Sequence, residues 1–306
     1  MKEQGSYGTT PLALENIDLL EGLYAEVNGP TVRFDQSKFF RASGDLAALG
    51  HLALRTDGRA AAFYGVFPMD MVKGESLVRA AQSGATMTAP SDQGRGLFTL
   101  LAKSAFESAE AAGVEFVFGF PNRNSYPGFI RRLGWSHRRT MTSRVWPAIV
   151  PRSRRTILEK RQALSGSELI STQLRSGVVL ESSLATSEWG YVLRGDDFVA
   201  GKSSEVFTIR HRGFLAYCRI GRRALEIGDL VIEPGEKAED AVSELREFAT
   251  IAGRPFVTMH ISPGSAIDRR LVGSGFERNG LPYAHLTFRD ENPDDYDFTW
   301  IDYDTF

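Results

Sequence analysis

The chain has a single cysteine, Cys218, among its 306 residues. One cysteine excludes an internal disulfide and a cysteine-based zinc cluster, and its place in an apolar run predicts a small buried side chain. No apolar run approaches the ~20 residues that a membrane-spanning helix needs, and the amino-terminal residues lack the pattern of a signal peptide. We therefore expect a soluble, cytoplasmic protein without a membrane partner.

The chain also lacks a large excess of positive or negative charge. The formal net charge is −2 and the pI is about 6.3, so the charge balance does not favour a nucleic acid as partner. The His, Asp and Glu residues show no metal-ligand spacing, and we expect no metal. A hydrophobic fraction of 42% is ample for packed cores, and the length favours two domains.

The most informative stretch, residues 84–135, reads as a strand, a glycine turn, a helix and a second strand. Residues 85–89 are a strand candidate that Pro90 stops. Apolar side chains then recur at helical spacing over residues 97–112, and residues 114–120 are typical of a buried strand. The turn between the first strand and the helix consists of Gln93, Gly94, Arg95 and Gly96.

This turn has the features of an anion site. Successive backbone N–H groups that lead into a helix form a concavity for anions, and the helix dipole strengthens it. The turn lacks both the Gly-Lys-Ser/Thr of a nucleotide P-loop and the third glycine of a dinucleotide fingerprint. Two glycines that merely allow a tight turn are the alternative interpretation.

The turn resembles that of the GNAT acetyltransferases, which carry Gln/Arg-x-x-Gly-x-Gly/Ala there. Gln93 and Gly96 match, and Phe98 stands in place of the usual small residue. Residues 122–125 and the Leu-Gly-Trp at residues 133–135 resemble the family's Asn-rich loop and Leu-Gly-Phe ending. The resemblance implies an acetyl-CoA site with a defined set of residues. These are Thr86, Met87, Thr88, Gln93, Gly94, Arg95, Gly96, Leu97, Phe98, Asn122 and Asn124.

The order of elements predicts a mixed α/β (α+β) fold. A helix over residues 16–28, a hairpin over residues 51–67 and a strand over residues 76–81 precede the strand–helix–strand unit. Asp57-Gly58 provides the hairpin turn. Antiparallel strands followed by a crossover unit form a mixed, mostly antiparallel sheet flanked by helices.

The second half of the chain repeats the first in outline, which suggests two tandem GNAT-like domains. In the second copy the glycine turn is replaced, and Glu239 and Asp240 would repel a pyrophosphate there. We therefore expect one acetyl-CoA site, in the first half. The corresponding parts are a hairpin at residues 207–217, a strand and proline at 228–234, a helix at 238–251 and a strand at 256–261.

These features divide the chain into an acetyl-CoA-binding domain, residues 1–150, and a degenerate copy, residues 166–306. A basic linker over residues 151–165 joins them, after the proline at Pro147.

The tail over residues 290–306 is rich in both carboxylates and aromatic side chains. It is either an exposed acidic segment or a segment that packs over a cleft. In the second case Trp300, Asp302 and Asp304 would bind an amine acceptor, with the ring stacking on a sugar and the carboxylates pairing with the cation.

The chemistry that the resemblance implies is direct attack of an amine on a thioester. The amine must lose a proton, and the carbonyl oxygen needs a hydrogen-bond donor, implied to be a backbone N–H within residues 86–88. Many members use a tyrosine as acid for the leaving thiolate. That position holds Ile130, and Tyr126 is the nearest substitute, with packing of Tyr126 and solvent as acid left open. Candidate bases are Asp70, Glu75, His51 and His137.

The expected function is an N-acetyltransferase that moves an acetyl group from acetyl-CoA to a primary amine of a small molecule. The tandem domains and the aromatic-acidic tail look like members that act in polysaccharide sugar synthesis, which implies an amino sugar, free or nucleotide-linked. One alternative is a Fem-type aminoacyl transferase, whose aminoacyl-tRNA substrate suits the acidic pI poorly. The other is a non-catalytic acyl-CoA-binding or scaffold protein. The oligomeric state is not predicted.

Overall fold

The computed structural model describes residues 7–36, 39–40, 49–148, 170–173, 179–185, 189–202 and 205–306. The predicted basic linker, residues 151–165, lies outside these residues, and the division into domains stays a prediction.

The first half contains the helices and strands expected from its sequence, with one difference. The strands expected at residues 76–81 and 85–89 are a single strand, because the chain passes through a bulge at Ala85 without ending. The elements are β1 (Gly8–Pro11), α1 (Ile17–Asn28), β2 (His51–Leu54), β3 (Ala60–Lys73), β4 (Ser76–Thr88), η3 (Pro90–Asp92), α2 (Leu97–Ala111), β5 (Phe116–Gly119), the π-helical turn η4 (Gly128–Arg132) and β6 (Ser136–Pro147).

The second half contains the hairpin, strand, helix and strand expected at residues 207–261. Cys218 is fully buried in β10, and burial raises the pKa of its thiol. The elements are β7 (Ile170–Gln173), β8 (Tyr191–Val192), α4 (Asp196–Ala200), β9 (Phe207–His211), β10 (Phe214–Ile220), β11 (Ala224–Ile232), α5 (Ala238–Ile251), β12 (Phe256–Ile261), α6 (Ala266–Arg270), β13 (Phe276–Thr287), η5 (Pro293–Asp295) and η6 (Trp300–Asp302).

The strands form one continuous sheet, in the order β1-β2-β3-β4-β5-β13-β6-β12-β11-β10-β9-β7, with β8 beside β3. The described pairs are antiparallel except β4 with β5 and β11 with β12. The mixed, mostly antiparallel sheet is therefore as expected, although the two halves share a single sheet. The sequence had given no sign of that continuity.

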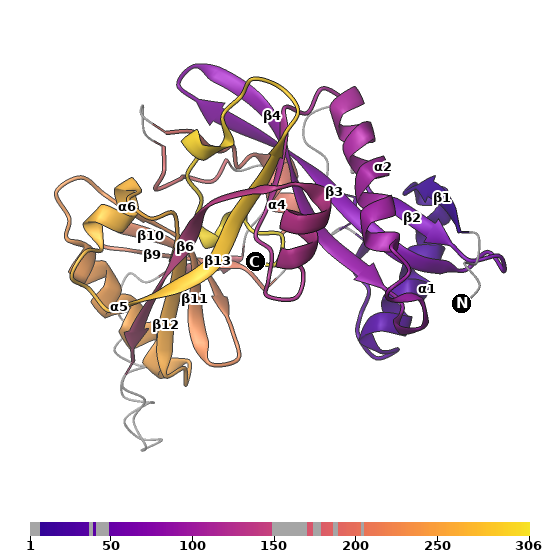
Figure 1. Ribbon diagram of the computed structural model, residues 1–306. Helices are drawn as coiled ribbons and strands as arrows, with labels where there is room; N and C mark the ends of the chain where they lie inside the picture. Colours follow the sequence, from indigo (N-terminus) through magenta and orange to yellow (C-terminus); the bar gives the residue numbers. More distant parts are fainter. Residues whose placement is uncertain are drawn as a thin grey trace.

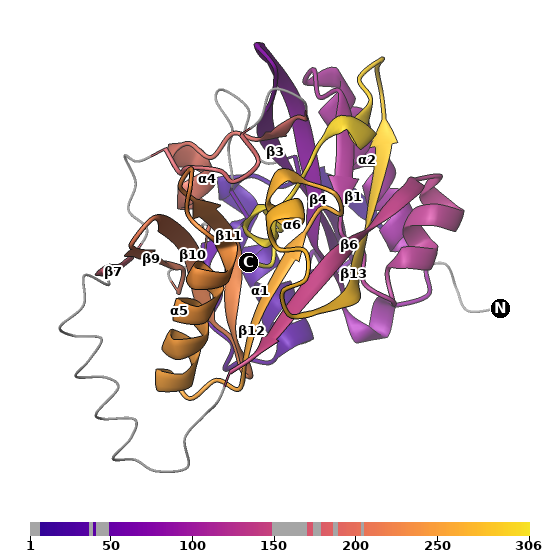
Figure 2. The same ribbon diagram turned by 90° about the vertical axis from the view of Figure 1, so that its left-hand side faces the viewer.

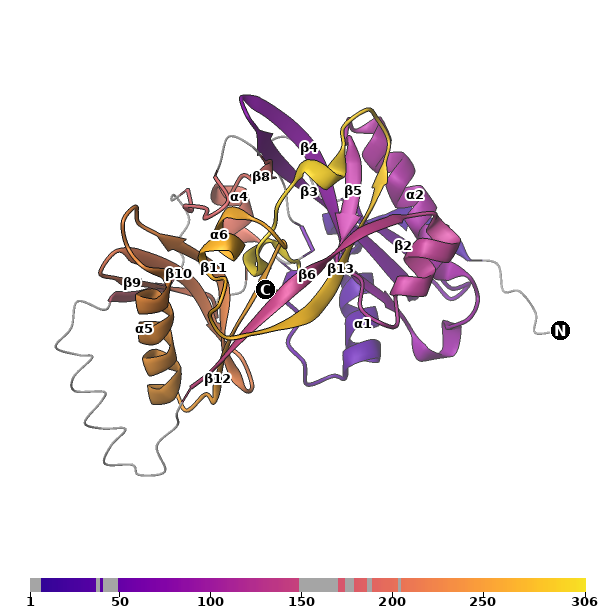
Figure 3. The same ribbon diagram turned by 60° about the vertical axis from the view of Figure 1, so that its left-hand side comes forward.

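The continuity arises because the halves exchange their last strands. β13 pairs with β5 of the first half, β6 pairs with β12 of the second half, and β6 and β13 pair with each other between them. Figure 1 shows magenta β6 and yellow β13 crossing between the two halves, and Figure 3 shows the same pair from another side. Each half thus needs a strand of the other to cover the edge of its parallel pair.

Helices cover both faces of the sheet in the first half, and a helix and the tail cover opposite faces in the second half. Successive residues of a strand point to opposite faces, and on β3 Tyr64 packs with α2 whereas Phe63 packs with α1. In the second half α5 covers one face, and the tail covers the other with Ile301 and Phe306. In Figures 1 and 2 the carboxyl end of the chain lies near the middle of the molecule.

No helix in the described part of the chain is both long and apolar enough to cross a membrane.

Candidate active site

β4 and β5 separate at the centre of the first half. They pair in parallel from Ala80 and Phe116 to Gln82 and Phe118, and the pairing stops there. Just beyond, Ala85 has a φ of +51°, the only positive value at a non-glycine residue in the described chain. The divergence and the bulge leave the β5-facing backbone edge of β4 without a neighbouring strand. An extended ligand can pair with such an edge.

A cavity of about 720 Å³ opens at this divergence. Its wall is formed by β4, the start of the glycine turn, the first turn of α2, the loop after β5, η4 and the tail. The lining residues are Ser83, Gly84, Ala85, Thr86, Met87, Thr88, Gln93, Phe98, Phe120, Pro121, Asn122, Asn124, Ser125, Pro127, Gly128, Phe129, Arg132, Asp304 and Thr305. Seven of the predicted acetyl-CoA residues are in this set: Thr86, Met87, Thr88, Gln93, Phe98, Asn122 and Asn124.

In the glycine turn Gln93 lines the cavity, as does Phe98 in the first turn of α2, whereas the predicted residues between them, 94–97, are not lining residues. Gly94 and Gly96 have φ values of +76° and +79°, which a side chain other than glycine rarely adopts, and Gly96 is the N-cap of α2. Within the described residues, the backbone N–H groups of residues 94–98 donate no hydrogen bond. Unpaired backbone N–H groups at a helix N-terminus are typical of an anion-binding site. The side chain of Leu97 packs in the core.

Asp92 anchors this turn to the sheet. Its carboxylate accepts hydrogen bonds from Tyr7 at 2.6 Å and from Ser91 at 2.6 Å, and it pairs with Arg55 at 2.7 Å. Burial alone would raise the pKa of Asp92, but these hydrogen bonds and the Arg55 charge outweigh it and hold the pKa at about 2. The turn is therefore held by a carboxylate that is ionised at neutral pH.

The loop after β5 is organised by Asn122. Its Oδ1 accepts hydrogen bonds from the backbone N–H groups of Asn124 at 2.9 Å and Ser125 at 3.1 Å. This arrangement is a local cap, and it starts the helical turn that ends in η4. Asn122 therefore shapes the cavity wall, while Asn124 and Arg132 are exposed polar side chains on it.

Tyr126 is not a lining residue of the cavity. Its hydroxyl oxygen lies 2.8 Å from Nδ1 of His137 on β6, whose other ring nitrogen lies 3.2 Å from the Thr140 hydroxyl. The structure therefore gives Tyr126 a hydrogen-bond partner outside the cavity. Its role as acid stays a prediction. Of the candidate bases, His51 also has a partner elsewhere, the Ser108 hydroxyl at 2.9 Å.

The tail packs, and its three predicted acceptor residues lie in different places. Asp302 is fully buried and both of its carboxylate oxygens are bound by Arg194, so no oxygen there is left for a cationic amine. The indole of Trp300 stacks on His260 at 4.1 Å, outside the cavity. Asp304 does line the cavity, and its Oδ2 accepts a hydrogen bond from the Ala85 N–H at 3.2 Å.

Comparison with known proteins identifies the first half. Residues 17–138 match the family model described as the acetyltransferase (GNAT) domain. This part of the chain, less than half of its length, therefore matches a GNAT acetyltransferase domain. The match includes β4, the glycine turn, α2, β5 and η4, which together form most of the cavity wall. No curated protein has a matching sequence.

Solved structures extend the likeness of the GNAT domain to the whole fold. A probable N-acyltransferase from Enterococcus faecalis has a TM-score of 0.63 at 13% identity, over 92% of this chain and 73% of that one. A tandem GNAT protein from the clavulanic acid biosynthesis pathway has a TM-score of 0.51 at 12% identity, over 94% and 100%. A fungal glucosamine N-acetyltransferase region has a TM-score of 0.51 at 11% identity, over 92% and 38%. At such identities the likeness concerns the fold alone.

Sequence reasoning missed part of the cavity of the GNAT domain. Gly84 and Ala85 come just before the residues predicted from the family resemblance, and their bulge has no sequence signal beyond the glycine. Phe120 and Arg132 flank the predicted loop and were within reach of the same reasoning. Thr305 adjoins Asp304, which the carboxylates and aromatic side chains of the tail did predict, but Thr305 itself carries neither signal.

Proposed function

We propose that this protein is an N-acetyltransferase that moves an acetyl group from acetyl-CoA to a primary amine of a small molecule. One observation carries the proposal. The open edge of β4 and the carboxylate of Asp304 line a single cavity, and the turn with unpaired amides lies between two of its lining residues, Gln93 and Phe98. The turn suits phosphates, the edge suits an extended thioester arm, and the carboxylate suits an amine.

The chain supports each part of this reaction with different groups. The amides of the turn and the positive end of the α2 dipole would hold the pyrophosphate of acetyl-CoA. A backbone N–H within residues 86–88, which the family resemblance implies, would donate to the thioester oxygen as negative charge develops on it. The leaving thiolate would take a proton from Tyr126 or from solvent.

For the acceptor we propose an amino sugar, free or nucleotide-linked. The same cavity is lined by the Asp304 carboxylate and by three aromatic rings, those of Phe98, Phe120 and Phe129. Apolar ring faces suit the C–H face of a sugar, and a carboxylate suits its ammonium group. Trp300 could bind the acceptor only if its indole moved away from the His260 ring on which it stacks.

We propose that the second half is a degenerate copy that binds no acetyl-CoA. Lys237 is the N-cap of α5, and Glu239 and Asp240 lie in its first turn, where they would oppose a phosphate. With acetyl-CoA as donor, a cytoplasmic location stays our prediction.

The test is a screen of amines for thiol release that depends on acetyl-CoA. It should include glucosamine, galactosamine and their nucleotide-linked forms, with simple alkyl amines as controls. Selective release with amino sugars would support the proposal. Binding of acetyl-CoA without thiol release from any amine would instead support a non-catalytic binder, and transfer only from aminoacyl-tRNA would support the Fem-type alternative.

A further inference from the structure

Three basic side chains of the second half hold the end of the tail. Arg194 binds Asp302, Lys202 Nζ donates to the carbonyl of Tyr303 at 2.8 Å, and Arg219 Nη1 donates to the carbonyl of Thr305 at 2.7 Å. The backbone is thus fixed on both sides of Asp304. The side chain of Asp304 extends from this fixed segment into the cavity.

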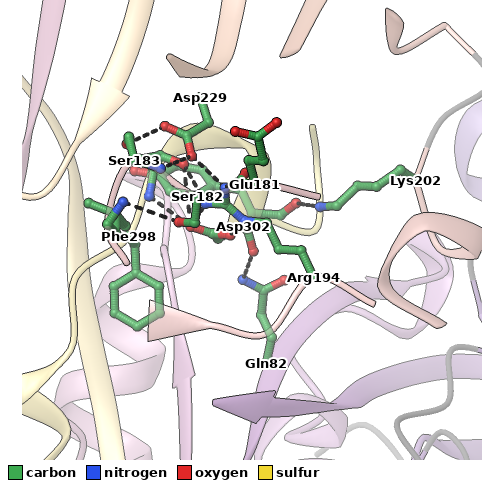
Figure 4. A network of polar contacts seen from close by, with 12 residues as sticks. Gln82, Glu181, Ser182, Ser183, Arg194, Lys202, Asp229, Phe298 and Asp302 are labelled. Atoms are coloured by element: carbon green, nitrogen blue, oxygen red, sulfur yellow. Dashed lines mark hydrogen bonds and ion pairs between the residues drawn. The ribbon is translucent and has the colours of Figure 1, made fainter. Parts of the chain in front are cut away.

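The strongest of these attachments is completely buried. Arg194 makes a two-pronged contact with Asp302, with distances of 2.9 and 3.0 Å, and it also pairs with Asp229 on β11. Gln82, the last residue of β4 paired with β5, donates from its amide to the Asp302 carbonyl at 2.9 Å. Figure 4 shows these groups converging from the tail, β11 and β4. The network therefore fixes the tail relative to the point where β4 and β5 diverge.

The contact of Asp304 with β4 is close and requires a glycine. A Cβ atom at Gly84 would lie 2.2 Å from Asp304 Oδ2. The same oxygen accepts the hydrogen bond from Ala85, at the bulge of β4. The carboxylate therefore lies against the backbone edge at which the proposed function places the thioester.

We propose that Asp304 is the base of the transfer reaction and that Arg194, Lys202 and Arg219 are residues that position it. This inference rests on the proposed function. The protonated amine gives one proton to the Asp304 carboxylate, and the freed nitrogen lone pair attacks the thioester carbon. The C–N bond forms, the C–S bond breaks, the attacking nitrogen loses its second proton to water, and the thiolate takes a proton from Tyr126 or from solvent. Asp304 then releases its proton to water.

The first test is Asp304→Asn, with Asp290→Asn as control because Asp290 is an exposed carboxylate of the same tail outside the cavity. We expect Asp304→Asn to lower kcat at saturating acceptor by about 100-fold at pH 7. Acetyl-CoA affinity should stay within about twofold. A kcat equal to that of the wild type, with only the acceptor KM raised, would overturn the role of base and leave a binding role.

The second test moves the carboxylate without removing it. Gly84→Ala places a methyl group where Asp304 now lies, whereas Gly22→Ala adds one where no atom lies within 4 Å. We expect Gly84→Ala to lower kcat at least about tenfold and Gly22→Ala to leave it unchanged. Full activity of a folded Gly84→Ala protein would show that the position of Asp304 does not matter.

The third test separates positioning from general stability. Arg219→Gln removes the contact with the Thr305 carbonyl and should lower kcat. In an Asp304→Asn background the same change should have no further effect, because Arg219 acts only through Asp304. An equal loss in both backgrounds would assign Arg219 to stability and overturn its positioning role.

Failure of this inference and failure of the proposed function give different results. If the wild-type protein releases no thiol with any amine, the proposed function fails before any variant is made. If the wild type is active and Asp304→Asn is equally active, only the inference fails. A thermal unfolding curve and acetyl-CoA titration for each variant confirm that a loss of kcat belongs to a folded protein.

Discussion

The ring of Tyr303 lies parallel to the ring of Phe120, with centroids 3.8 Å apart and planes 15° apart. This stack joins the tail of the second half to the residue that follows β5 of the first half. Since Phe120 lines the cavity together with Asp304 and Thr305, the tail forms part of the cavity wall and of the core behind it.

Removal of residues 298–306 should therefore destabilise the fold. Phe298, Ile301, Tyr303 and Phe306 are all at most 2% exposed, and burial of each such side chain contributes about 1.5–3 kcal/mol. We expect a clear fall in the urea midpoint of unfolding relative to the full chain. A truncated protein with the same midpoint would show that these side chains add nothing to stability.

Gly96→Asp should weaken acetyl-CoA binding more than Gly96→Asn does. Asn and Asp tolerate a positive φ about equally, so both variants accept the strain at +79° and differ mainly in charge. We expect at least a tenfold difference in Kd by calorimetry, because a carboxylate beside a phosphate is repelled. Equal Kd values for the two variants would show that no phosphate of acetyl-CoA binds at this turn.

The full chain should bind one acetyl-CoA. The second half has Glu239 and Asp240 in the first turn of α5, where the first half has a glycine turn with unpaired amides. Calorimetric titration should give a stoichiometry of one, and Gly96→Asp should reduce that single signal. A second binding event that persists in Gly96→Asp would place a site in the second half.

Tyr126→Phe should leave kcat within about twofold of the wild-type value. The Tyr126 hydroxyl contacts His137 and does not belong to the cavity lining, so its loss removes one partly exposed hydrogen bond. Turnover at saturating acceptor and acetyl-CoA is the measurement. A fall of tenfold or more would instead support Tyr126 as the acid for the thiolate.

A fall in pH should lower the stability of the fold through protonation of Asp92. Its pKa is about 2 in the fold against the usual 3.8, so the folded state binds its proton less readily than the unfolded state. The stabilisation is fully present above pH 3.8 and is lost as the pH falls through about 2. Urea unfolding between pH 5 and pH 2, at steps of about half a unit, should show a smaller pH-dependent loss for Asp92→Asn than for the wild type. Parallel curves would mean that Asp92 does not provide this linkage.

Local patterns were enough to predict most elements and the core of the cavity. Hydrophobic periodicity predicted α1 and α2, and the outline repeat predicted α5; each of the three buries a stripe at 3.6-residue spacing. The two glycines at 94 and 96 predicted a turn, and the structure gives both of them positive φ values, which glycine adopts without strain. The family resemblance predicted an acetyl-CoA site at β4 and the loop after β5, and both segments line the cavity.

Only the tertiary structure decided how the halves join and which tail carboxylate reaches the site. The exchange of β6 and β13 depends on pairing between strands far apart in the sequence. The alternation of inward and outward side chains along a strand is the same with either neighbour, so it does not reveal which strand is the partner. Asp302 and Asp304 are two residues apart and chemically identical. Arg194 is buried beside β11 and forms an ion pair with Asp302. Two residues further along the chain, Asp304 lies against Gly84. That choice follows from packing across the whole molecule.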